Sequence, residues 1–166
     1  MLSHSEVKPF SLVTNKPLLQ LHSTGTAVIE LQSLLAHWGT YRGEINGKFD
    51  RFVEAAVKRF QFAVFLPDDG KVGPLTWKAL ETGAPVNVPM VRLGSTGNAV
   101  STIQEVLKEA GFYYGQVDGV FGPVTEASVR NLQQSFNLIV DGVVGPRTWW
   151  ALSRIPRAYL PDGAGC

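Results

Sequence analysis

The stretch Asp118-Gly119-Val120-Phe121-Gly122 decides the fold, because its pattern occurs four times in the chain. An Asp or Asn in the first position can accept a hydrogen bond from the backbone N–H two residues later, and the following glycine permits a positive φ. The apolar residue that comes next can enter a core. The pattern therefore predicts four tight structural turns, which begin with Asn46 and Gly47, Asp69 and Gly70, Asp118 and Gly119, and Asp141 and Gly142.

Each turn leads into a sequence that is typical of a helix start. Three of the four continue as Gly-Pro-x-Thr, and proline is favoured at the first helical position because its missing N–H costs nothing there. The remaining copy has Asp50-Arg51 in place of Gly-Pro. Aspartate is itself a favoured N-cap residue, so we expect a helix after all four turns.

The turns belong to a longer repeat with a period of 72 residues. Residues 18–80 align without gaps with residues 90–152, and 27 of the 63 positions are identical. The segment between the copies is rich in proline and glycine, as linkers are. We therefore divide the chain into an N-terminal extension (1–17), a first repeat (18–81), a linker (82–89), a second repeat (90–153) and a C-terminal tail (154–166).

Each repeat opens with an amphipathic helix. Apolar residues recur at helical spacing over residues 27–38 and again over 99–110, which places one apolar stripe on each helix. Gly39 and Gly111 follow directly, as helix C-terminal signals do. A second helix and a shorter third helix follow the two turns of each repeat. The predicted fold class is all-α, with two tandem three-helix bundles and short turn-rich loops.

Several other residues that recur in both repeats are expected to serve the fold. Trp77 and Trp149 fall at apolar positions of the short third helices, which predicts burial. The glutamines Gln32, Gln61, Gln104 and Gln133 stand beside apolar positions, where their amides can satisfy loop backbone groups. Trp150 has no tryptophan counterpart in the first repeat, and we expect it to cover the tail, the linker or the other repeat.

Composition excludes several classes of protein. The 166 residues include 15 basic and 14 acidic side chains and are 45% hydrophobic, which excludes disorder and argues against nucleic acid as a partner. No apolar run approaches the roughly 18 residues of a transmembrane segment. Residues 1–9 show no basic segment followed by an apolar stretch, so we expect no secretory signal there.

The titratable residues do not assemble into a catalytic site. Cys166 is the single cysteine and the last residue, so no disulfide framework or multi-cysteine metal site can form within the chain. The histidines His22 and His37 have no histidine counterpart in the second repeat. Each Asp-Gly turn supplies one acid, fewer than a calcium loop requires. We therefore expect no enzyme activity, no metal and no cofactor.

Both repeats resemble the small three-helix peptidoglycan-binding domain that is found attached to bacterial cell-wall hydrolases. Residues 111–127 and 140–149 carry the similarity most closely, whereas the first repeat departs from the pattern at Asn46, 50–51 and 67–68. The resemblance implies a non-catalytic module that binds peptidoglycan or muropeptide fragments and anchors itself or a partner at the wall. It also implies an extracytoplasmic location at the cell wall, while the lack of a signal peptide leaves the cytoplasm open.

A peptidoglycan site would use aromatic rings, amide groups and a cation, because the ligand offers flat sugar faces and peptides that end in carboxylates. The segment after the first helix of each repeat supplies such groups, and in the second repeat Arg130 on the next helix adds the cation. The ligand-binding candidates are Tyr113, Tyr114, Gln116 and Arg130 in the second repeat and Tyr41 and Arg42 in the first. For Tyr41 and Tyr113 the alternative is that they cap the core with their hydroxyls in water.

Two further functions remain open. The chain could be a protein-interaction module whose ligand is another polypeptide, an interpretation that the altered first repeat and the unmatched Trp150 favour. It could also be the targeting part of a wall hydrolase whose catalytic domain lies elsewhere.

Overall fold

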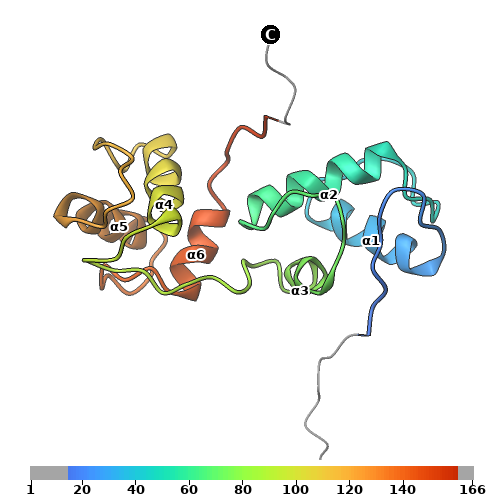
Figure 1. The fold of residues 1–166 in the computed structure, drawn as a ribbon, viewed down its shortest axis with the longest axis horizontal. Coiled ribbons are helices and arrows are strands. Elements are labelled where there is room, and N and C mark those ends of the chain that lie inside the picture. The colour runs from blue at the N-terminus through green and yellow to red at the C-terminus, as the bar shows by residue number, and fades with distance from the viewer. Residues whose placement is uncertain (1–14, 161–166) are drawn as a thin grey trace, which may run out of the picture.

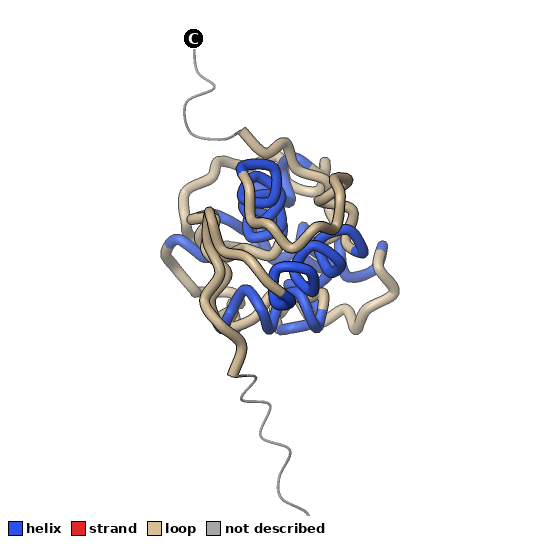
Figure 2. Tube along the Cα trace, turned by 90° about the vertical axis from the view of Figure 1, so that its right-hand side faces the viewer, coloured by secondary structure: helices blue, strands red, loops and turns tan. Residues whose placement is uncertain are grey.

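The computed structural model describes residues 15–160, which form two helical units joined by a linker (Figure 1). The first unit contains α1 (Thr26–His37), α2 (Arg51–Ala63) and α3 (Pro74–Thr82), and the second contains α4 (Asn98–Glu109), α5 (Pro123–Ser135) and α6 (Pro146–Ser153). Only helices and loops occur in this part of the chain (Figure 2), apart from four isolated β-bridges. The predicted all-α fold class with two three-helix bundles is confirmed.

A glycine in the left-handed region follows the end of the first helix of each unit. Gly39 has a φ of 75°, and its N–H donates to the carbonyl of Ala36, while the N–H of Thr40 donates to that of Leu35. This pair of bonds satisfies the last carbonyls of α1. The helix ends at His37, with Trp38 as its C-cap, one residue earlier than the apolar spacing predicts.

Each unit has its own hydrophobic core. Trp77 and Trp149 are 1% and 3% exposed, as predicted. Their indole N–H groups donate to the carbonyls of Pro17 and Pro89, respectively. Each tryptophan therefore fills a core and also holds the segment that precedes the first helix of its unit.

One fully buried glutamine closes each of the four turns. In every turn the glutamine Oε1 accepts from the N–H of the glycine, and Nε2 donates to the carbonyl two residues after the Asp or Asn. The Asp or Asn Oδ1 accepts from the N–H of that same residue. The predicted role of these glutamines is confirmed, and it explains how small bundles tolerate four buried amides.

The chain returns from the second unit to the first after α6. In this return segment (residues 154–160), the guanidinium of Arg157 donates to the carbonyls of Phe62 and Ala63 at the end of α2. It also lies 4.2 Å and 4.4 Å from the ring centroids of Phe62 and Phe65. A cation is favourable both at a helix C-terminus and over aromatic rings. The segment passes between the two units (Figure 1).

A second arginine of the return segment connects the units at the linker. Arg154 donates to the carbonyl of Gly83, 3.0 Å away, and its guanidinium lies about 5 Å from the rings of both Trp38 and Trp150. Trp150 therefore covers the start of the tail, as predicted, and its ring also meets the edge of Phe136.

Phe65 extends the core of the second unit with a side chain from the first. Its ring lies 5.1 Å from the ring of Trp149, between centroids. Phe65 has a φ of 62°, whereas the equivalent residue of the second repeat is Asn137, with a φ of 54°. Asparagine adopts this left-handed conformation at a lower energetic cost than phenylalanine. The strained backbone at Phe65 is thus stabilised by packing between the repeats.

Candidate functional site

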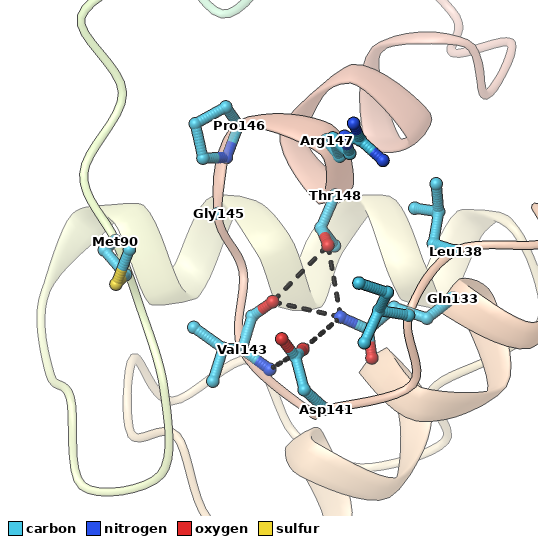
Figure 3. A pocket seen from close by; sticks show the side chains of 10 residues that line it. Met90, Gln133, Leu138, Asp141, Val143, Gly145, Pro146, Arg147 and Thr148 are labelled. Atoms are coloured by element: carbon cyan, nitrogen blue, oxygen red, sulfur yellow. Dashed lines mark hydrogen bonds between the residues drawn. The ribbon is translucent and has the colours of Figure 1, made fainter.

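A hollow of about 370 Å³ lies in the second unit, where the loop after α5 meets the start of α6 (Figure 3). Its walls come from the segment before α4, the end of α5 with the following loop, and the first turn of α6. Its lining consists of Met90, Gln133, Leu138, Ile139, Asp141, Val143, Gly145, Pro146, Arg147 and Thr148.

The first unit has the same hollow, with a volume of about 280 Å³. All ten of its lining residues stand 72 positions before those of the second hollow: Leu18, Gln61, Leu66, Pro67, Asp69, Lys71, Gly73, Pro74, Leu75 and Thr76. Because both bundles form it at matched positions, the hollow belongs to the repeated design.

A hydrogen-bonded cluster fixes the polar part of the second hollow. The Nε2 atom of Gln133 lies 2.9 Å from Asp141 Oδ1, 3.0 Å from the carbonyl of Val143 and 3.1 Å from Thr148 Oγ1 (Figure 3). The N–H of Val143 and the amide of Gln133 hold the pKa of Asp141 below its usual value, because both donate to the charged form. Gln61, Asp69 and Thr76 repeat this cluster in the first unit.

Exposed apolar side chains stand at the rims of both hollows. Met90 and Ile139 are 66% and 76% exposed in the second unit, and Leu18 and Leu75 are 60% and 45% exposed in the first. Apolar groups left in water around a pre-formed polar cluster are typical of a ligand site.

Each hollow contains one cation, but from a different position. Lys71 supplies it in the first unit, where the second has Val143, and Arg147 supplies it in the second, where the first has Leu75. The two hollows therefore keep their charge while exchanging the residues that carry it.

The structure places Tyr41 and Tyr113 in the cores. They are 6% and 5% exposed, and their hydroxyls donate to the carbonyls of Glu44 and Gln116. The rings cap the core, as the alternative for this pair has it, but the hydroxyls bind protein groups instead of water. Since their ring faces are buried, we leave both tyrosines out of the binding surface proposed below.

The other four candidates are exposed but do not form one cluster. Tyr114 is 88% exposed, and Gln116 is also exposed in the same loop. Arg130 instead contacts Glu126 and the carbonyl of Val140, beside the turn at Asp141. Arg42 borders a separate hollow of about 500 Å³ with Arg59 on α2.

The hollows themselves are the feature that sequence reasoning missed. Only part of their polar cluster had a signal: in the two Gly-Pro-x-Thr motifs that begin α3 and α6, the threonine stands 15 residues after a buried glutamine. The Gly-Pro pair predicts a helix start and gives the threonine no role, although Thr148 and Thr76 accept hydrogen bonds from Gln133 and Gln61, respectively.

Two observations bear on other kinds of site. Within residues 15–160, no group of three or more His, Cys, Asp or Glu side chains is arranged to hold a metal ion. None of the described helices is long and apolar enough to cross a membrane. Cys166 and His4 lie outside the described residues.

Comparison with known proteins gives relatives for both units. The chain is 35% identical over 111 residues to the N-acetylmuramoyl-L-alanine amidase CwlM of Mycobacterium tuberculosis, an alignment that covers 60% of this chain and 26% of CwlM. It is 46% identical over 59 residues to a spore cortex-lytic enzyme of Bacillus cereus, with coverage of 36% and 23%. The chain thus spans about a quarter of the length of these curated relatives.

Among solved structures, the SleB N-terminal domain is 44% identical, with a TM-score of 0.38, and the match covers 39% of this chain and 88% of that one. The family model described as "Putative peptidoglycan binding domain" matches residues 24–80 and again residues 96–152. These two matches span most of the described residues. They contain every lining residue of both hollows except Leu18 and Met90. The chain therefore belongs to the peptidoglycan-binding domain family and is a tandem pair of its modules.

Proposed function

We propose that the two equivalent hollows are the sites through which this chain binds the bacterial cell wall. The observation that carries the proposal is their duplication: ten lining positions recur at matched places in both family modules. A polar cluster fixed by hydrogen bonds supplies orientation, and the exposed apolar rim supplies area to bury.

The chain acts as a non-catalytic anchor that holds itself or a partner at the wall, outside the cytoplasm. The family is a binding module, and the relatives are named as an amidase and a cortex-lytic enzyme of which this chain spans about a quarter. A wall hydrolase is therefore the partner that we propose.

A second candidate for wall binding is the exposed loop after α4, which carries Tyr114 and Gln116, together with the equivalent loop of the first unit, which carries Arg42. The 88% exposure of Tyr114 favours it, because a large aromatic ring in water can stack on a flat sugar face. Contact with this surface rather than with the hollows would show as loss of wall binding in Tyr114→Ala.

Co-sedimentation with purified sacculi tests the proposal. We expect the protein to be enriched in the pellet relative to a helical control protein of similar size, and no enrichment would overturn wall binding. The same preparation is applied to a zymogram of cell-wall material. We expect no cleared zone, and a cleared zone would contradict the non-catalytic assignment.

A further inference from the structure

The apolar part of both hollows is aliphatic. Leu18, Leu66 and Leu75 contribute it in the first unit, and Met90, Leu138 and Ile139 in the second. No lining residue of either hollow is aromatic. A sugar with a flat apolar face gains most from an aromatic ring, whereas small aliphatic side chains of a peptide fit against leucine and methionine.

The cations of the hollows are available to a ligand. Both Lys71 and Arg147 are exposed, and neither side chain forms a hydrogen bond or ion pair with another described residue. Arg147 stands at the α6 end of the hollow that Leu138 also lines (Figure 3). A cation beside an aliphatic wall can bind a carboxylate and leave its hydrophobic neighbour in contact with the wall.

The acidic residue of each hollow restricts the charge that a ligand can carry. Asp69 and Asp141 are directed into the turn, where Oδ1 accepts two hydrogen bonds from the protein. Each hollow thus combines one anion with one cation. That balance disfavours a polyanion and suits a ligand end with a carboxylate and donor groups such as amide N–H or an amino group.

We infer that the hollows bind the peptide part of peptidoglycan through a free carboxylate, rather than its sugars. The inference rests on the proposed function, since it names the portion of the wall polymer that the same two sites recognise. Lys71 and Arg147 stand at different positions of the repeat, but each gives its hollow one cation that can bind a carboxylate. The two hollows therefore differ in sequence and carry the same charge.

Calorimetric titration with a free stem tetrapeptide that ends in D-alanine tests this inference. We expect two peptides to bind per protein. Arg147→Leu and Lys71→Val each install the residue that the other repeat carries at that position, so both folds are retained. Each substitution should weaken one of the two sites about tenfold through loss of a charge-assisted bond, and the double variant should weaken both.

Three controls separate the possible results. Arg92→Leu removes an exposed cation outside the hollows and should leave the titration unchanged. The tetrapeptide with its carboxylates converted to amides should bind about tenfold more weakly than the free acid. Peptide-free glycan strands, prepared with an amidase, should release no heat.

The result that would overturn the inference is heat from the glycan strands with none from the tetrapeptide, or peptide binding that the double variant retains in full. If intact sacculi sediment the protein under these same conditions, wall binding stands and only the choice of peptide over sugar fails. If sacculi do not sediment it, the proposed function itself fails.

Discussion

Gln133 shows how a single buried amide can hold a turn. It is 1% exposed, accepts from the N–H of Gly142 and donates to the carbonyl of Val143. Leucine has nearly the same volume but offers neither bond, so Gln133→Leu leaves the N–H of Gly142 without a partner and the carbonyl of Val143 with only the longer bond from Thr148 Oγ1. We expect the free energy of unfolding to fall by about 3 kcal/mol.

Chemical denaturation measures this change, and the next residue of α5 provides the matched control. Gln134 is exposed, so Gln134→Leu should change the free energy of unfolding by less than about 0.5 kcal/mol. Equal losses for the two variants would show that the buried amide contributes nothing specific.

The aspartates of the turns make the stability of the protein depend on pH. The N–H of Val120 and the amide of Gln104 lower the pKa of Asp118 below its usual value of 3.8, and the Asp141 turn does the same. A depressed folded pKa stabilises the protein fully above the unfolded pKa and ceases to do so as pH falls through the folded pKa. We therefore expect the melting temperature to decrease once the pH drops below about 4.

The first repeat supplies the variant that tests this pH dependence. Asn46 makes the same contacts as Asp118 without a charge. Asp118→Asn together with Asp141→Asn should flatten the fall in melting temperature between about pH 4 and pH 2. A fall as steep as that of the parent protein would assign it to other carboxylates.

At the scale of elements, α2 and α5 begin in different ways at equivalent positions. Asp50 caps α2, because its carboxylate accepts from the N–H groups of Phe52 and Val53 at 3.0 Å each. In α5, Gly122 occupies the cap and Pro123 the first helical position, with no side-chain cap. Two solutions to one structural need are thus present in one chain.

Asp50→Ala removes the cap of α2 and should lower the free energy of unfolding by about 1 kcal/mol. The double substitution Asp50→Gly and Arg51→Pro copies the start of α5, and it should restore most of that loss because proline needs no N–H partner there. Thermal unfolding of the three proteins measures both effects. A double variant less stable than Asp50→Ala would contradict the equivalence of the two starts.

The elements could be predicted from the sequence because their causes are local. Turn chemistry, proline at helix starts and apolar spacing act over a few residues, and each of these patterns occurs in both repeats. The contacts of Arg157 with Phe62 and Phe65 could not be predicted in this way. They join segments more than ninety residues apart in sequence, and no second copy exists to mark them.

In the candidate site, too, the features with local causes could be predicted and those that join distant segments could not. Exposure of Tyr114 follows from its loop and its replacement by Arg42 in the first repeat, and the structure leaves it exposed. The hollow could not be predicted, because its walls come from three separate segments of each repeat. Arg130 and Tyr113 were grouped in one candidate site, but Arg130 lies on α5 and contacts the loop at Val140, whereas the hydroxyl of Tyr113 contacts Gln116 in the loop after α4.

At the scale of the whole molecule, the return segment and Phe65 hold the two modules together. Phe65→Asn, which copies Asn137, relieves the strained backbone of the first repeat but removes the ring that contacts Trp149. Combined with Arg157→Ala, it should let the modules move independently while each remains folded. We expect shorter rotational correlation times by NMR relaxation for each module, with helical content unchanged.

Arg92→Ala serves as the control for that measurement, because Arg92 is exposed and its side chain takes part in none of these contacts. It should leave the correlation times as they are in the parent protein. Independent motion already present in the parent protein would show that the return segment does not fix the modules. If they are fixed, two hollows on one body gain affinity for a polymer that reaches both.

Chemical-shift mapping with a soluble muropeptide, which carries both sugars and peptide, tests the central claim most directly. The account predicts that the largest backbone shifts fall in residues 66–76 and 138–148, around the two hollows. It predicts small shifts around Tyr114 and Arg42. Shifts confined to the loops that carry Tyr114 and Arg42, or no shifts at saturating muropeptide, would contradict it.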